Sequence, residues 1–154
     1  MEQIYYLKRP HTAAAEKHTE AQPAAAELRA ADNRLTAEAR HLMATDLARL
    51  LDTPHTPHLQ WTGSTADLME AAHAVYTEGC LRHADGQPLT FGQIVGRACR
   101  MLNVRQPANP RSLARRAEER KGIRTATLLY RYRHWLGSGR QPSPVALCIR
   151  QSPH

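Results

Sequence analysis

Residues 90–102 read TFGQIVGRACRML and carry the clearest helix signal in the chain. Thr90 and Gln93 form a capping box, in which each side chain bonds the backbone amide of the other at a helix N-terminus. The apolar side chains recur every three or four residues as far as Leu102, as they do on the buried stripe of an amphipathic helix. The sequence therefore predicts a helix over residues 90–103 that packs the core.

An arginine-rich segment, residues 110–121, follows that helix. Asn109 can cap it, and Pro110 suits the first helical position because the amide hydrogen that proline lacks would have no helical partner there. Its apolar stripe is narrow, so most of its circumference faces water or a partner. A hydrophobic helix followed by a cationic one is typical of helix-turn-helix DNA readers, although the connection is longer than the usual three or four residues.

Two further helices flank this pair. Ser64, with Asp67 three positions on, predicts a helix start, and Gly79 predicts its end. Residues 123–136 have apolar side chains at helical spacing, while their alternating Tyr and Arg would suit a strand. We favour a helix because Thr125 can cap it and Gly137 can end it.

The N-terminal third has a different composition. Residues 1–23 lack any sustained period and are interpreted as a flexible arm, and an Ala- and Leu-rich helix is expected to begin after Pro23. Leu28, Leu35 and Leu42 are seven positions apart, a spacing that fits the buried face of a helix or the seam of a coiled-coil homodimer. Core packing is favoured because a coiled coil needs more heptads.

These signals predict an all-α, mainly α protein: a compact helical bundle with a helix-turn-helix-like pair, preceded by an N-terminal helix and a flexible arm. A short apolar run at residues 145–149 can dock as a strand edge. The expected regions are an arm over residues 1–23, a helix and Pro-rich linker over 24–58, a helical DNA-binding domain over 59–137 and a C-terminal tail over 138–154.

The charge of the chain is segregated. Residues 1–96 carry a net charge of −4, residues 97–140 carry +10, and Arg150 completes the total of +7. Eleven of the twelve cations in the basic segment are Arg, whose planar guanidinium binds phosphate through two hydrogen bonds. Faces that only keep a protein dissolved usually intersperse both signs, so the segregation favours a polyanionic partner.

Residues 59–64 read LQWTGS, and Leu68, Glu70 and Ala74 follow them. This run resembles the opening of the C-terminal domain in the RteC family of conjugative-transposon regulators. So does the later order of a helix ending near residues 102–104, an Arg/Lys-rich helix and a basic aromatic helix. The resemblance covers about residues 59–136, and its Trp-Thr-Gly-Ser box is the specific part.

The resemblance implies a helical DNA-binding regulator of the excision genes of a mobile element in a Bacteroides-type bacterium. Trp61 and Thr62 would then fix how the chain enters its helix and would read no bases. Family members have a longer N-terminal domain, and the arginine helix is richer in Arg here, so the same DNA target is not implied.

Other classes of protein find little support in the sequence. No apolar run reaches the length of a membrane span and no signal peptide opens the chain, so we expect a cytoplasmic protein without a membrane partner. Cys80 and His83 are too few for a zinc pattern, and no nucleotide-binding or nucleophile motif occurs, so we expect no metal, no cofactor and no enzyme activity.

The leading hypothesis is a transcriptional regulator whose cationic helix contacts double-stranded DNA. The alternative is an interaction module whose basic face docks an acidic protein. Tyr130 and Tyr132, with His134 and Trp135, could also stack on single-stranded bases, but an aromatic core is favoured. The predicted contacts to DNA are Arg111, Arg115, Arg116 and Arg120, and those to phosphates are Lys121, Arg124, Arg131 and Arg133.

Overall fold

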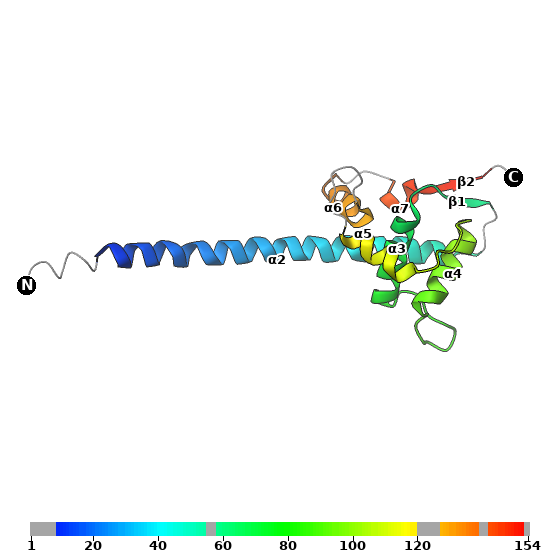
Figure 1. Cartoon of the computed structure of the whole chain (residues 1–154), viewed down its shortest axis with the longest axis horizontal. Coiled ribbons are helices and arrows are strands. Elements are labelled where there is room, and N and C mark those ends of the chain that lie inside the picture. The colour runs from blue at the N-terminus through cyan, green and yellow to red at the C-terminus, as the bar shows by residue number, and fades with distance from the viewer. Residues whose placement is uncertain (1–8, 55–57, 120–126, 139–141, 153–154) are drawn as a thin grey trace, which may run out of the picture. The chain divides into compact units, whose positions relative to one another are not determined.

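The computed structural model describes residues 9–54, 58–119, 127–138 and 142–152, with the backbone alone over residues 9–23. It divides into two compact units, residues 1–35 and residues 36–154. As predicted, the fold is mainly helical. In chain order the described elements are α2 (Arg9–Asp52), β1 (Leu59–Trp61), α3 (Thr65–Glu78), α4 (Phe91–Met101), α5 (Pro110–Glu119), α6 (Leu128–Ser138), α7 (Pro144–Leu147) and β2 (Ile149–Gln151) (Figure 1).

The first unit contains the N-terminal part of α2. This helix begins at Arg9 and continues through Pro23, so the flexible arm is wrong for residues 9–23, and so is the helix start that we predicted after Pro23. Alanine-rich sequence favours helix strongly, and an interior proline removes one backbone hydrogen bond without ending the helix here. All side chains from residue 24 to residue 35 are exposed.

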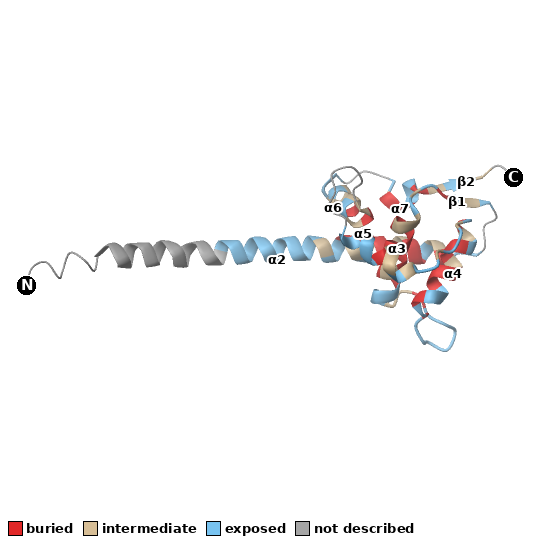
Figure 2. Ribbon diagram, in the orientation of Figure 1, coloured by how far each residue is buried: buried red, intermediate tan, exposed pale blue. Residues whose placement is uncertain are grey.

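The second unit is organised around α3. Eight of its fourteen residues are buried, including two acids, Asp67 and Glu70, so this helix is covered on most of its circumference. Both α4 and α5 pack on it, and α6 contacts it as well. Figure 2 shows the buried residues gathered where these helices meet.

Residues 36–52 of α2 belong to this second unit. The sequence had instead predicted a boundary near residue 58, with these residues in a separate N-terminal region. In these residues Ala, Leu and Met recur at helical spacing, so they share one apolar face of the helix, and that face packs into the core. Leu42 packs against that core, as the favoured interpretation of the leucine spacing predicted, whereas Leu28 and Leu35 are exposed. The buried residues of this stretch are Ala39, Met43, Ala44, Leu47, Ala48 and Leu51.

Most helix ends follow the predicted local signals. The Ser64 side chain accepts a hydrogen bond from the Asp67 amide, the Thr90–Gln93 capping box is complete, and Gly79 ends α3 in the left-handed conformation. The Asn109 side chain accepts from the Ser112 amide at 3.2 Å. Each of these caps satisfies backbone groups that a helix end leaves unpaired.

The segment with both helix and strand character is a helix, α6, as favoured from the sequence. Its first turn is capped by Thr127, whose hydroxyl accepts from the Tyr130 amide at 3.1 Å. The predicted cap, Thr125, lies outside the described residues. The predicted end at Gly137 is one residue early, since α6 continues to Ser138.

The C-terminal residues form part of the fold, in contrast to the tail expected from residue 138 onward. β2 pairs with β1 in antiparallel register, with Trp61 opposite Ile149. Of the apolar run over residues 145–149 that we expected to dock as a strand edge, only Ile149 is in a strand, because residues 145–147 belong to α7. The Thr62 amide donates to the Cys148 carbonyl at 2.8 Å, and the Trp61 amide donates to the Leu102 carbonyl at 2.9 Å. The WTGS box thus joins the end of α4 to the C-terminus.

Within that box, Trp61 is buried and its indole nitrogen donates to the Ser64 carbonyl at 2.8 Å. A Cβ on Gly63 would lie 3.1 Å from both the Trp61 ring and the Cys148 sulfur, so a side chain here would require these neighbours to shift by a few tenths of an ångström. This arrangement agrees with the scaffold role expected for Trp61.

A pair of glycine variants tests this packing. We expect Gly63→Ala to lower the free energy of unfolding by about 1–2 kcal/mol, because the two buried neighbours must move to admit a methyl group. Gly92→Ala is the matched control: nothing lies within 4 Å of its Cβ position in α4, and alanine favours helix over glycine by about 0.5–1 kcal/mol. Urea unfolding of both variants should give opposite signs, and a neutral Gly63→Ala would contradict the tight passage.

Candidate nucleic-acid interface

The arginine helix α5 is held on α3 by two small side chains. Ala114 and Ala117 are buried, and short side chains allow the backbones of α3 and α5 to approach closely. α4 packs on the same helix, so α3 is the common support of the two members of the predicted helix-turn-helix-like pair. Because the apolar stripe of α5 packs on α3, the opposite side of α5 is exposed and can contact a partner.

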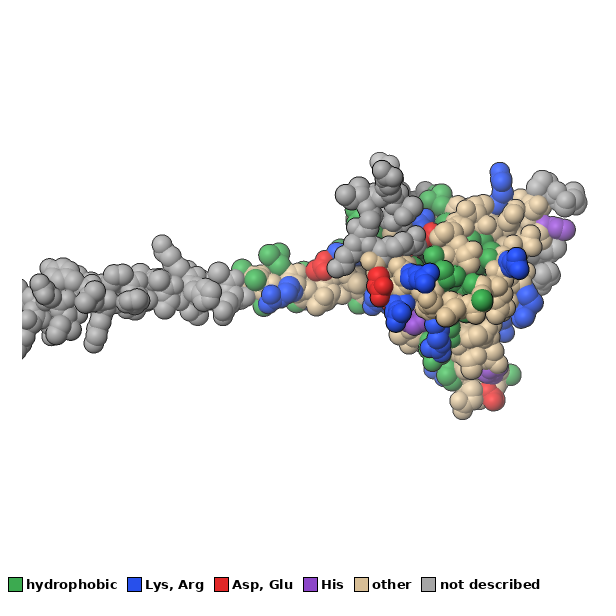
Figure 3. Space-filling model, viewed as in Figure 1, with side chains coloured by type: hydrophobic (Ala, Val, Ile, Leu, Met, Phe, Trp, Pro, Cys, Tyr) green, Lys and Arg blue, Asp and Glu red, His purple; other side chains and the backbone are tan. Residues whose placement is uncertain are grey.

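The outward side of α5 presents Arg115 and Arg116. The side chain of Arg115 is 77% exposed and reaches Glu119 at 3.9 Å, a distance at which an exposed ion pair contributes little. Arg116 is exposed and has no hydrogen bond or ion pair to another described residue. Figure 3 shows Lys and Arg side chains over the visible face of the second unit, with fewer Asp and Glu among them.

Arg111 lies at the edge of this side and is partly engaged by the protein itself. Its guanidinium carbon lies 5.4 Å from the centre of the Phe91 ring and 5.9 Å from that of Tyr76, the range of a cation–π interaction. This contact joins α5 to the start of α4 and the end of α3. Glu118, near the end of α5, faces His73 of α3 at 3.4 Å.

The predicted phosphate contacts have different surroundings. Arg131 on α6 forms a salt bridge of 2.5 Å with the buried Asp67 of α3, and Arg133 is half-buried. Within the described part of the basic segment, residues 97–140, the exposed arginines that we did not predict as contacts are Arg100 and Arg105; their only signal was their place in that segment. Arg120, Lys121 and Arg124 lie outside the described residues.

A buried carboxylate fixes α6 in place. Glu70 is 2% exposed, and its two oxygens accept the backbone amides of Leu128 and Leu129, each at 3.1 Å. These amides belong to the first turn of α6, where no helical acceptor exists and the helix dipole favours a negative charge. With Thr127 bonding the third amide, the start of α6 is satisfied mainly by a residue of another helix.

The opposite side of α6 is fixed by Tyr132, which is fully buried. Its hydroxyl donates to the Asp46 carboxylate of α2 at 2.6 Å and accepts from the Val145 amide of α7 at 3.3 Å. Burial, followed by the hydrogen bond to Asp46 and the charge of that carboxylate, raises the pKa of Tyr132 well above its ordinary value. Tyr132 is therefore core, as favoured, while Tyr130 is exposed.

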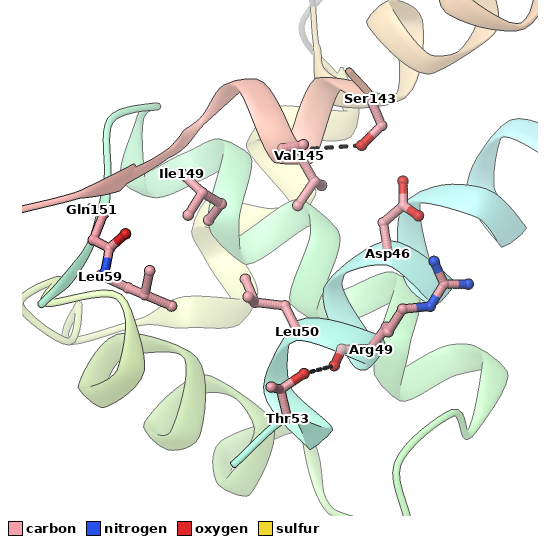
Figure 4. Close-up of a pocket in the computed structure, with 10 residues that line it drawn as sticks. Asp46, Arg49, Leu50, Thr53, Leu59, Ser143, Val145, Ile149 and Gln151 are labelled. Carbon is pink, nitrogen blue, oxygen red and sulfur yellow. Dashed lines mark hydrogen bonds between the residues drawn. The ribbon is translucent and has the colours of Figure 1, made fainter. Parts of the chain in front are cut away.

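A groove of about 570 Å³ lies where the end of α2 meets α7 and the sheet. Leu50, Leu59 and Ile149 line it, and Figure 4 shows Asp46 and Arg49 together at one side. The Asp46 carboxylate already accepts a hydrogen bond from the Tyr132 hydroxyl, so this acidic side chain of the groove has a structural role.

Reactive groups are sparse in the part of the chain that is described. Burial raises the pKa of the Cys99 and Cys148 thiols, which lowers the fraction of reactive thiolate. No three His, Cys, Asp or Glu side chains of the described residues lie close enough together to hold a metal ion. None of the described helices has the length and hydropathy needed to span a bilayer.

Replacing Glu70 tests how α6 is held. We expect Glu70→Gln to lower the free energy of unfolding by about 2–4 kcal/mol, because an amide group faces one of the two backbone donors and the charge at the helix start is removed. Glu78→Gln, an exposed acid of the same helix that faces His41, should cost under about 1 kcal/mol. Equal destabilisation of the two variants in denaturant titrations would show that Glu70 does not anchor α6.

Replacing Tyr132 with Phe should cost about 1–3 kcal/mol at neutral pH, because Asp46 and the Val145 amide no longer have their partner. The raised pKa sets the sign at high pH: the neutral phenol stabilises the fold fully below pH 10, the ordinary tyrosine value, and that contribution declines as the pH rises beyond it. The stability gap between wild type and Tyr132→Phe should therefore stay constant up to about pH 10 and shrink only above it in urea unfolding. A gap that did not shrink would contradict the buried phenol.

Comparisons of the chain with protein-family models, with curated proteins and with solved structures found no match.

Proposed function

We propose that the chain is a DNA-binding transcriptional regulator that contacts duplex DNA with α5. The observation that carries this proposal is the division of α5 into two sides. Ala114 and Ala117 are used against α3, while Arg115 and Arg116 face outward with at most one weak ion pair to a described residue. A helix that is fixed on its apolar side and cationic on the other is suited to a polyanion.

The size and chemistry of α5 support duplex DNA as that polyanion. Its ten residues span about 15 Å, and the major groove, about 12 Å wide, admits one α-helix. Guanidinium groups bond both phosphate oxygens and the acceptor edge of guanine. In the proposal Arg115 and Arg116 make these contacts, and Arg111, held over Phe91 and Tyr76, fixes the side of α5 that meets DNA.

The other predicted cations complete the interface. Arg120, Lys121 and Arg124 follow α5 in the sequence, and Arg131 and Arg133 lie on α6. We assign the α6 pair to phosphates, because phosphate contacts set the register of a protein on DNA and carry no sequence information themselves. Arg131 also forms the salt bridge to Asp67 that holds α6 to α3.

The resemblance of residues 59–136 to the RteC family supports a more specific proposal. The regulated genes would be those for excision or transfer of a conjugative transposon. The WTGS box, which carries the resemblance, has a structural role here because Trp61 is buried and Gly63 is closely packed.

The experiment that tests the proposal is fluorescence anisotropy with labelled duplex DNA at several salt concentrations. We expect Arg115→Ala/Arg116→Ala to weaken binding about tenfold to hundredfold. The slope of log K against log salt should fall by about one unit for each arginine–phosphate interaction that the substitutions remove. Both side chains are exposed, so the double variant should fold as the wild type does.

Arg49→Ala/Arg150→Ala is the control with the same change in charge, at exposed positions on α2 and β2. It should lower the affinity only slightly. If the two double variants weaken binding equally, α5 is not the contact helix. If no duplex binds at low salt while polyglutamate does, the protein instead docks an acidic partner.

A further inference from the structure

We propose that two copies of this chain pair through α2 over residues 24–35, with the two helices antiparallel. Every described side chain in this range is exposed, and two of them are large and apolar: Leu28 is 73% exposed and Leu35 is 37% exposed. Isolated exposed leucines are ordinary, but two on the same line of an otherwise unpacked helix form a surface that a second helix can cover.

The pattern of small residues defines the rest of this seam. Leu28 and Leu35 are seven positions apart, and Ala24 and Ala31 each precede a leucine by four positions, so all four share one stripe of the helix. In an antiparallel pair, Leu28 of one copy packs against Ala31 of the second copy, and Leu35 packs against Ala24. Every layer then places a large side chain opposite a small one, an alternation that lets two helices approach closely.

Charges beside the seam select this orientation. Glu27 and Arg34 flank the stripe on the same side, and neither has an ion pair within the described part of the chain. In the antiparallel register above, Glu27 faces Arg34 of the second copy, and the two-fold symmetry forms this pair twice. In a parallel, in-register pair Glu27 would face Asp32 of the second copy, and two carboxylates would repel each other.

A second copy therefore fits the surface in three respects: the exposed leucines are covered, each is matched by an alanine, and the flanking charges pair. The inference does not rest on DNA binding, because it involves only the first unit of the chain. It revises the alternative interpretation of the leucine spacing, a dimer through Leu28, Leu35 and Leu42, by limiting the seam to the exposed leucines, since Leu42 packs against the core of its own chain.

Sedimentation equilibrium of the full chain over micromolar to millimolar concentration tests the pairing. The wild type should show a concentration-dependent monomer–dimer equilibrium, and Leu28→Glu/Leu35→Glu should raise the dimer dissociation constant by about 100-fold or more, because each leucine leaves an apolar interface. The circular dichroism of the variant should stay helical, since neither side chain is in the core. A monomeric wild type over the whole range would overturn the proposal.

Charge reversal tests the orientation. Glu27→Arg alone and Arg34→Glu alone should each weaken the dimer about three- to tenfold, because each places like charges opposite one another, and the double exchange Glu27→Arg/Arg34→Glu should restore it. A parallel dimer gives the opposite result for the first variant, because Arg at position 27 would attract Asp32. A dimer strengthened by Glu27→Arg alone would therefore overturn the antiparallel arrangement.

Discussion

The position of α6 depends on one costly interaction, the burial of the Glu70 carboxylate. A lone charge in a core is strongly unfavourable, and two backbone amides of α6 stabilise this one by donating to it. The dependence is mutual, since the first turn of α6 would otherwise leave those amides unpaired. Glu70 is thus a reason for α6 to start at Leu128 and to lie against α3.

Features written in neighbouring residues could be predicted from the sequence. The caps at Ser64, Thr90 and Asn109 each join groups three positions apart, so their hydrogen bonds can be inferred from the order of residue types. The amphipathic stripe of α4 has the same local character. For these reasons the mainly helical fold, the bounds of α4 to within two residues and the start of α5 were predictable.

Features that join residues far apart in the chain could not be predicted from the sequence. Glu70 bonds amides 58 and 59 positions away, and Arg131 reaches Asp67 across 64 positions. Asp67 reads locally as part of a helix cap, and only the tertiary fold shows that its carboxylate also meets a guanidinium. The C-terminal strand was difficult for the same reason, because three residues of β2 become a strand only when β1 pairs with them.

The candidate interface shows that the number of arginines in a segment differs from the number that are exposed to a partner. By charge count, Arg111, Arg115, Arg116 and Arg131 are equivalent members of one basic segment. In the fold, Arg111 lies over two aromatic rings and Arg131 holds α6 to α3, whereas Arg115 and Arg116 project from the side of α5 that the core leaves uncovered. A sequence reveals how much positive charge a protein carries, but the packing of Ala114 and Ala117 decides which part of it faces a partner.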